Sequence, residues 1–183
     1  MLRKLNEAGY AEAIHGLALN KKQPDPQKLV ERQVPETLAA CGLGEGHDKF
    51  LEMIVVWLEI RAPLYWWKQF DTYRVGVTKQ SESTMHTLMK HPIAREAFSS
   101  KVPALYLNLW LMNQLREAGQ FETLIAVLPE GYLQRRAVML SYKSLKTILK
   151  QRQNHKLEEW REFCQWILKV VDHPELLEAA CQS

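Results

Sequence analysis

Cysteine is scarce in this sequence and follows no metal-binding or disulfide pattern. Cys41, Cys164 and Cys181 are an odd number, lie far apart and form no CxxC spacing, so reduced thiols are the simplest interpretation. The six histidines are also scattered, without an HxxxH or HxH pair near a carboxylate, and we expect no metal site. The GxSxG elbow of many hydrolases is absent as well, which leaves a Ser/His/Asp hydrolase without support.

Long apolar runs and concentrated positive charge are missing too. No segment approaches the roughly 18 apolar residues that cross a bilayer, and the amino-terminal MLRKLNEAGYAEAIHG is too polar for a secretory signal. We therefore expect a cytoplasmic protein with no membrane partner. The net charge of +3 is too small for a protein that binds nucleic acid. A small anionic ligand needs only a few well-placed cations and stays open as a partner.

The composition is that of an ordinary globular domain. With 183 residues, 46% of them hydrophobic and 25% charged, the chain can bury its own core, and we expect a single domain over 1–183. Periodicity predicts helices at 6–19, 27–43 with an interruption near Pro35, 64–70, 81–91, 103–119, 121–128, 142–152 and 155–171. The second of these ends in a glycine-rich turn at 42–46, and 103–119 is apolar enough for a central buried helix. Extended segments are predicted in the second half of 49–60, at 75–77 and at 135–141.

The stretch from Ile54 to His86 has the composition of a binding site. It holds three of the six tryptophans and then turns polar without becoming strongly charged. The polar side chains that follow the aromatic residues are Asp71, Thr72, Tyr73, Arg74, Ser81, Ser83, Thr84 and His86. Neither a surface loop nor a plain core segment needs this combination. The alternative is structural, because Ser81 and Ser83 also suit helix caps and single tryptophans are typical of cores.

Basic residues in the carboxyl-terminal half point to recognition of an anion. They are Arg135 and Arg136 after a proline-glycine turn, Lys143 and Ser144 where a strand meets a helix, and Arg152 and Arg161 on the polar sides of the last two helices. A guanidinium gives a phosphate two parallel hydrogen bonds, and hydroxyls at a helix start add donors beside its positive end. The alternative is that Arg152 and Arg161 are solvated helix residues.

Two segments of the chain resemble the flavin-dependent thymidylate synthases. HDKFLEMIVVWLEI is similar to the family's His-x-x-x-x-Glu-His strand region, which leads through Gln-x-x-Arg-His-Arg to a Ser-x-Asn-Glu-x-Ser-x-Arg signature. LPEGYLQRRAVMLSYKSLKTILKQRQNHKLEEWREF is similar to the family's Leu-Pro, its Asn-x-Arg-Ser-Leu helix start and its closing Gln-x-Glu-Ile-Arg. The resemblance covers about 47–168 and leaves 1–46 as a helical extension. Small phage and prophage proteins with APLYWWxxFDTY, STMH and NHKLxEW are similar as well.

The resemblance implies an α+β fold with helices packed on a small antiparallel sheet. It also implies a homotetramer whose sites form between subunits. In the second segment, Ser144 matches the family's serine, Lys143 takes the place of its arginine, and Ser141 stands where the family has asparagine. Arg152 matches the arginine before the last turn, and Arg161 matches the arginine that binds the uridylate nucleotide in the family.

The first segment departs from the family pattern. In the register that starts at Gln69, Asp71-Thr72-Tyr73 replaces the Arg-His-Arg that holds the flavin. In the register that starts at Ser81, Glu82 and Thr84 match the family's glutamate and serine, and His86 replaces a nucleotide-binding arginine. Each charge change beside a pyrophosphate costs on the order of 1 to 3 kcal/mol.

The resemblance therefore implies a divergent thymidylate synthase-like protein that binds a pyrimidine nucleotide of the deoxyuridylate type. It would transfer a one-carbon group with FAD, whose site would include Asp71, Thr72 and Ser141, and His86 would serve as acid or base because its unperturbed pKa lies near neutrality. The residues expected to line the substrate are Tyr73, Arg74, Ser81, Ser83, Thr84, Arg136, Lys143, Ser144, Arg152 and Arg161. The alternative is a non-catalytic protein that binds or sequesters a nucleotide and has lost the flavin site.

Overall fold

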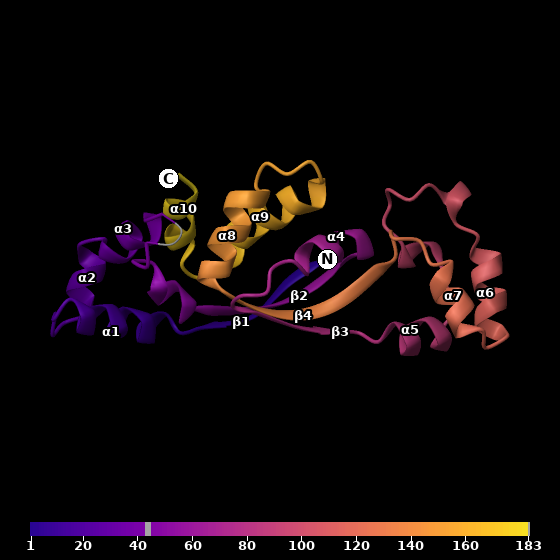
Figure 1. Cartoon of the computed structure of the whole chain (residues 1–183), viewed down its shortest axis with the longest axis horizontal. Coiled ribbons are helices and arrows are strands. Elements are labelled where there is room, and N and C mark those ends of the chain that lie inside the picture. Colours follow the sequence, from indigo (N-terminus) through magenta and orange to yellow (C-terminus); the bar gives the residue numbers. More distant parts are fainter. Residues whose placement is uncertain (43–44, 183) are drawn as a thin grey trace. The chain divides into compact units, whose positions relative to one another are not determined.

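A four-stranded sheet carries the fold (Figure 1). The computed structural model describes residues 1–42 and 45–182, with the backbone alone for 105 and 180–182. The strand order is β1-β2-β4-β3, with β1 (Leu2–Ala8), β2 (Val55–Pro63), β3 (Val77–Ser81) and β4 (Leu133–Ser141). Tyr142 N bonds to Ile54 O at one end of the β2-β4 pair and Leu64 N to Tyr132 O at the other, so this pair is antiparallel.

Strands β2 and β4 lie where the sequence predicts them. In β2, Val56, Leu58 and Ile60 are buried and alternate with more exposed residues, as expected for a β-branched, half-buried strand. The end of β4 is buried through Val138 and Leu140. Strand β3 begins at the last residue of the extended segment expected at 75–77 and continues beyond it.

The start of the helix expected at 6–19 is wrong, because residues 2–8 form strand β1. The segment is largely polar, and an edge strand pairs on one side only. Gly9 then turns the chain with a φ of 96°, and a Cβ there would lie 2.0 Å from the carbonyl oxygen of Met53. Helix α1 (Tyr10–Asn20) therefore begins only after this glycine.

Contacts between residues divide the chain into two compact units, and the single domain stays a prediction. The unit made of 2–59, 74–78 and 138–183 contains α1, α2 (Gln27–Glu31), α3 (Val34–Ala40), the 3-10 turn η1 (Lys49–Glu52), α8 (Tyr142–Arg152), α9 (Glu158–Val170) and α10 (Pro174–Gln182). Tyr142, Trp160 and Phe163 are among its fully buried residues, and α10 packs against α3 and α8. The helix expected at 27–43 is broken at Gln33, whose φ is 53°. Residues 43 and 44 of the expected glycine-rich turn lie outside the described residues.

The other unit consists of Met1, 60–73 and 79–137. Its helices are α4 (Leu64–Phe70), α5 (Thr84–Lys90), α6 (Leu109–Glu117) and α7 (Phe121–Ala126), with the 3-10 turns η2 (Arg95–Ala97) and η3 (Ala104–Tyr106). Its apolar core contains Leu88, Ile93, Phe98, Leu107, Met112, Leu124 and Tyr132.

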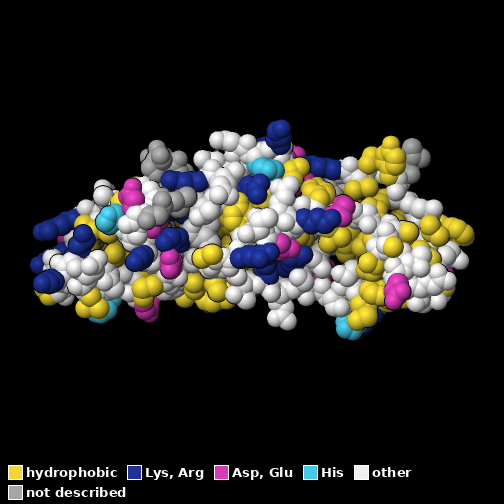
Figure 2. Space-filling model, in the orientation of Figure 1, with side chains coloured by type: hydrophobic (Ala, Val, Ile, Leu, Met, Phe, Trp, Pro, Cys, Tyr) yellow, Lys and Arg dark blue, Asp and Glu magenta, His cyan; other side chains and the backbone are white. Residues whose placement is uncertain are grey.

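The central buried helix expected at 103–119 is wrong. The helical part is α6 alone, which starts where the Asn108 side chain accepts the Leu111 N–H. Met112 is buried, whereas the Trp110 residue is 72% exposed. Figure 2 shows hydrophobic side chains gathered on the surface of the part that carries α5, α6 and α7. The segment 103–119 therefore contributes Leu107 and Met112 to the core of this unit, but α6 lies at the surface and exposes Trp110.

Within residues 1–42 and 45–182, no helix is both long and apolar enough to cross a membrane. The same residues contain no group of three His, Cys, Asp or Glu side chains placed to hold a metal ion. Cys41 and Cys164 are free cysteines, and the Cys181 side chain lies outside the described part.

Candidate functional site

Asp71 is the centre of an ion-pair cluster just after α4. Its carboxylate accepts hydrogen bonds from Lys79 Nζ at 2.7 Å and from Arg136 Nη1 at 2.9 Å. The Arg136 guanidinium also donates from Nε to Gln134 Oε1 at 2.9 Å and lies 4.4 Å above the Trp67 ring. Burial alone would raise the pKa of Asp71, but the hydrogen bonds from Lys79 and Arg136 outweigh it and lower that pKa. The carboxylate therefore stays charged and pairs with both cations.

Trp67 and Phe70 form the apolar base of this cluster. Both are buried, and Trp67 Nε1 donates to the Gln134 carbonyl at 3.0 Å. Lys79 Nζ lies 5.7 Å from the centroid of the Phe70 ring, and the Tyr73 ring meets Phe70 edge-on with centroids 6.3 Å apart. The aromatic residues of this stretch thus serve as core and as a platform for cations at once.

The hydroxyl residues of the predicted site take local roles. Thr72 Oγ1 donates to a backbone carbonyl of α4 at 2.8 Å, and Ser83 Oγ accepts the His86 N–H at 3.4 Å as the cap of α5. Thr84 Oγ1 accepts a hydrogen bond from a side-chain amide of β4 at 3.2 Å. Ser81, Ser83 and His86 are exposed. The capping interpretation of Ser83 is confirmed, and His86 remains accessible to a ligand.

At the N-terminus of α8, two serine side chains form hydrogen bonds with each other's residues and with the segment just before β3. Ser141 Oγ accepts the Ser144 N–H at 3.2 Å, and Ser144 Oγ donates to the Val75 carbonyl at 2.6 Å. Gly76 has a φ of 64°, and a Cβ there would come within 2.5 Å of Ser141 Oγ. Ser141 and Ser144 are 3% and 8% exposed, so both hydroxyls are used inside the chain. Arg74, nearby in sequence, is exposed.

Lys143 faces acidic side chains. Its Nζ lies 2.8 Å from Glu52 Oε1 and 3.4 Å from Asp48 Oδ1, and the bond to Glu52 raises the pKa of Lys143 against the effect of burial. One turn along α8, the fully buried Lys146 donates to Asp48 Oδ2 and to the Cys41 carbonyl, each at 2.7 Å. Burial would raise the pKa of Asp48, but the bonds from Lys146 and Lys143 lower it. Sequence reasoning missed this buried pair, although a lysine on the apolar face of α8 was a signal for it.

Arg152 and Arg161 both lie around the turn between α8 and α9. The Arg152 guanidinium lies 5.0 Å above the Trp160 ring, and Arg161 Nη1 donates to the carbonyls of His155 at 2.7 Å and Lys156 at 3.1 Å. Burial, and then the charges of Arg152, Arg161 and Lys156, lower the pKa of His155. The structure therefore brings these two predicted arginines close to His155, beside the first turn of α9, which carries Glu158 and Glu159.

A second buried carboxylate, Glu7, was also missed. Glu7 Oε1 accepts the Tyr142 hydroxyl, while Glu7 Oε2 accepts the Asp172 N–H at 2.9 Å and Lys4 Nζ at 3.1 Å. Burial, and then Glu7, raise the pKa of Tyr142. The contacts join β1 to α8 and to the segment before α10. No sequence signal identified them, because β1 itself was not predicted.

The residues at the positions of the flavin site do not fit a pyrophosphate in this arrangement. The Asp71 carboxylate is itself paired with Lys79 and Arg136, the Thr72 hydroxyl donates to backbone, and the Ser141 hydroxyl caps α8, so none of the three offers a cation or an unused donor. A pyrophosphate needs cations and unused donors. We therefore assign no chemical step of this chain to a flavin.

Comparison with known proteins identifies the fold. No family model and no curated protein matches this sequence. A crystal structure of the flavin-dependent thymidylate synthase ThyX from Helicobacter pylori, complexed with FAD and dUMP, matches with a TM-score of 0.79 and 15% identity, over 98% of this chain and 98% of that chain. A second ThyX structure from Helicobacter pylori with FAD and dUMP matches with a TM-score of 0.75 and 15% identity, over 100% and 99%. The chain thus has the flavin-dependent thymidylate synthase fold, and the expected helices on a small antiparallel sheet are confirmed.

Proposed function

We propose that this protein binds a pyrimidine nucleotide of the deoxyuridylate type. The observation that carries the proposal is the likeness, over 98% of the chain, to a thymidylate synthase structure complexed with FAD and dUMP. The nearness of Arg152 and Arg161 to each other around the α8–α9 turn supports it, because their guanidinium groups would hold the phosphate or base there. The other residues proposed to line the ligand are Tyr73, Arg74, Ser81, Ser83, Thr84, Arg136, Lys143 and Ser144.

Two versions of the proposal differ in catalysis. In the first, the protein is an enzyme that transfers a one-carbon group, and the exposed His86 acts as acid or base. FAD would be its cofactor only if residues other than Asp71, Thr72 and Ser141 held it. In the second, the nucleotide is bound or sequestered without chemistry. The ion pairs of Asp71 favour the second version. Lys79 and Arg136 already pair with the Asp71 carboxylate, so they are occupied within the chain and are not free to bind the pyrophosphate of a flavin.

Absorbance and calorimetry separate these versions. Protein that is yellow as purified, with the flavin absorbance band, supports the enzyme, while colourless protein that does not respond to added FAD removes the flavin-dependent version. Titration with dUMP tests the nucleotide itself, with saturable heat and a thermal shift as the expected result. If neither dUMP nor any other common deoxynucleotide changes the melting temperature, the proposal is wrong.

Arg161→Ala tests the assignment of one residue. We expect the affinity for dUMP to fall roughly 10- to 100-fold, the effect of losing one charge-assisted hydrogen bond. The exposed Arg32, just after α2, gives a matched control because Arg32→Ala removes the same charge. Circular dichroism checks that both variants stay folded. Unchanged affinity in folded Arg161→Ala would remove this residue from the site.

We further propose that the protein is a cytoplasmic homotetramer whose site is shared between neighbouring chains. Light scattering measures the mass directly. A clean monomer of 21.3 kDa would contradict the shared site, whereas a tetramer would support it.

A further inference from the structure

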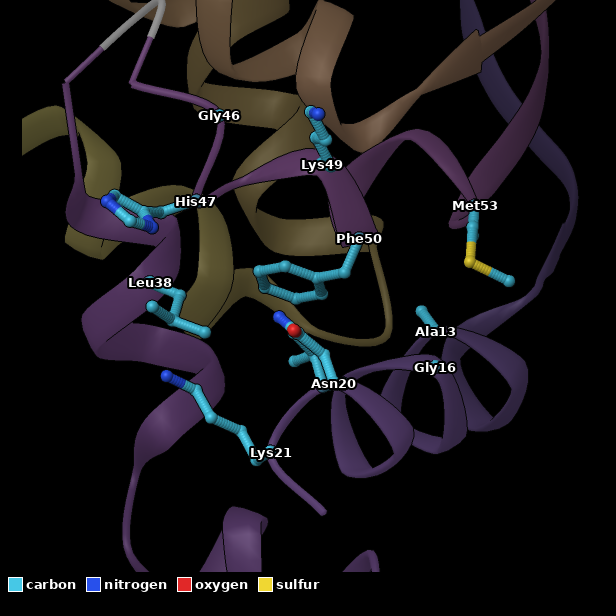
Figure 3. Close-up of a pocket in the computed structure, with 11 residues that line it drawn as sticks. Ala13, Gly16, Asn20, Lys21, Leu38, Gly46, His47, Lys49, Phe50 and Met53 are labelled. Carbon is cyan, nitrogen blue, oxygen red and sulfur yellow. The ribbon is translucent and has the colours of Figure 1, made fainter. Parts of the chain in front are cut away.

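A cavity of about 270 Å³ opens in the unit made of 2–59, 74–78 and 138–183. Its walls come from α1, from α3 and from the segment 46–53, which includes η1 (Figure 3). None of the residues assigned above to the nucleotide lines it. The cavity therefore needs an explanation of its own.

Apolar side chains form the interior of the cavity. Leu17 of α1 and Phe50 of η1 are only 6% and 5% exposed. Figure 3 shows the Phe50 ring and the Leu38 side chain facing the same space. An apolar body of a ligand would be removed from water here, which is the main source of affinity in small-molecule sites.

The rim of the cavity is positively charged and polar. Asn20, Lys21, His47 and Lys49 line it and are exposed, and no carboxylate is among the lining residues that the structure describes. In Figure 3 the Asn20 amide lies just below the Phe50 ring, the Lys21 side chain extends from the end of α1 toward Leu38, and the Lys49 ammonium points away from Phe50. A ligand with an anionic group at one end would find the Lys21 ammonium and a neutral donor on that side of the cavity.

Gly16 gives an independent indication that the space is kept open. It lies within α1, where glycine costs about 1 kcal/mol relative to alanine. It is not among the glycines with positive φ, and the one neighbouring atom near an added Cβ is Met53 Sδ, at an ordinary 3.7 Å. Neither the backbone nor the packing thus requires glycine, but a side chain at this position would narrow the cavity that Gly16 lines.

We propose that this cavity binds a small molecule that carries one anionic group on an apolar body. The apolar interior contacts the body, and the Lys21 end of the cavity contacts the anion. The site is separate from the proposed nucleotide site, so either can fail without the other.

Phenyl phosphate is the probe, and phenol is its neutral counterpart. We expect saturable binding of phenyl phosphate in calorimetry and at least tenfold weaker binding of phenol. Gly16→Leu should weaken phenyl phosphate at least tenfold by filling the space, and Lys21→Ala should weaken it roughly three- to tenfold. Lys28→Ala, an exposed lysine of α2 outside the cavity, should change nothing.

Gly16→Ala separates the effect on binding from the effect on stability. The variant should melt at a higher temperature because alanine favours the helix, yet bind phenyl phosphate more weakly. If Gly16→Leu does not fold, Gly16→Ala and Lys21→Ala decide the matter.

Three results would overturn the proposal. One is the absence of saturable phenyl phosphate binding, and another is equal binding of phenol. The third is undiminished binding of phenyl phosphate in folded Gly16→Ala and Lys21→Ala, which would place the probe elsewhere. The affinity of Gly16→Ala for dUMP should remain that of the wild type, and this result distinguishes the cavity from the nucleotide site.

Discussion

Replacing Asp71 by asparagine removes the charge that holds Lys79 and Arg136 at 2.7 and 2.9 Å, and it keeps the size of the side chain. Breaking a fully buried ion pair costs about 3 to 5 kcal/mol, whereas an exposed pair contributes about 0 to 1 kcal/mol. The Asp71 side chain is 42% exposed, and those of Arg136 and Lys79 are 14% and 21% exposed. We therefore expect Asp71→Asn to lower the free energy of unfolding by roughly 1 to 2 kcal/mol at pH 7.

The pH dependence of this loss follows from the lowered pKa of Asp71. A carboxylate with a lowered pKa in the folded state stabilises the protein above its unfolded pKa, which is about 3.9. That stabilisation disappears as the pH falls through the folded pKa. Urea unfolding of the two proteins should thus differ most at pH 6 to 7, and the difference should close below about pH 4.

Glu130→Gln is the matched control. It removes the carboxylate of an exposed ion pair, in which the Glu130 and Lys68 side chains are 54% and 69% exposed. We expect the free energy of unfolding to change by less than about 0.5 kcal/mol. The reasoning about Asp71 is refuted if Asp71→Asn is no worse than this control at pH 7. It is also refuted if the loss stays the same from pH 7 to pH 3.

Gly76→Ala should lower the free energy of unfolding by roughly 1 to 3 kcal/mol, because its Cβ would come within 2.5 Å of a serine hydroxyl at the start of α8. Gly119→Ala has a similar φ of 70° but nothing within 4 Å of its Cβ, so it should cost less, and equal losses in urea unfolding would exclude the steric explanation. Asp48→Asn leaves the fully buried Lys146 without its carboxylate and should cost about 3 kcal/mol. A loss below about 1 kcal/mol in the same assay would show that this pair is not held as the structure has it.

The elements that could be predicted from the sequence are those with strong local periodicity. Helices α4 and α8 have the bounds expected for them, and α9 lies within the expected 155–171. One face of α9 is buried through Trp160, Cys164 and Ile167, which follow one another at intervals of three or four residues. These signals succeed because burying one face of an element imposes its period on that stretch of sequence.

The errors arise where burial depends on distant partners. Strand β1 is polar and becomes a strand by pairing with β2, so its own residues carry no strong strand signal. The segment 103–119 is apolar enough for a core helix, but Trp110 lies on the surface. Composition alone does not say which apolar surface the rest of the chain will cover.

For the candidate site, the sequence by itself determined which chemical groups are available: the arginines, the hydroxyl residues, and the aspartate at position 71. Only the tertiary structure decided which of these groups meet. Arg136 contacts Asp71 across 65 positions, and Lys146 contacts Asp48 across 98. Contacts over such separations depend on strand order, register and helix packing, which local periodicity does not encode. The structure therefore shows that Asp71 is a partner of two cations within the chain, a role that its place in the sequence did not reveal.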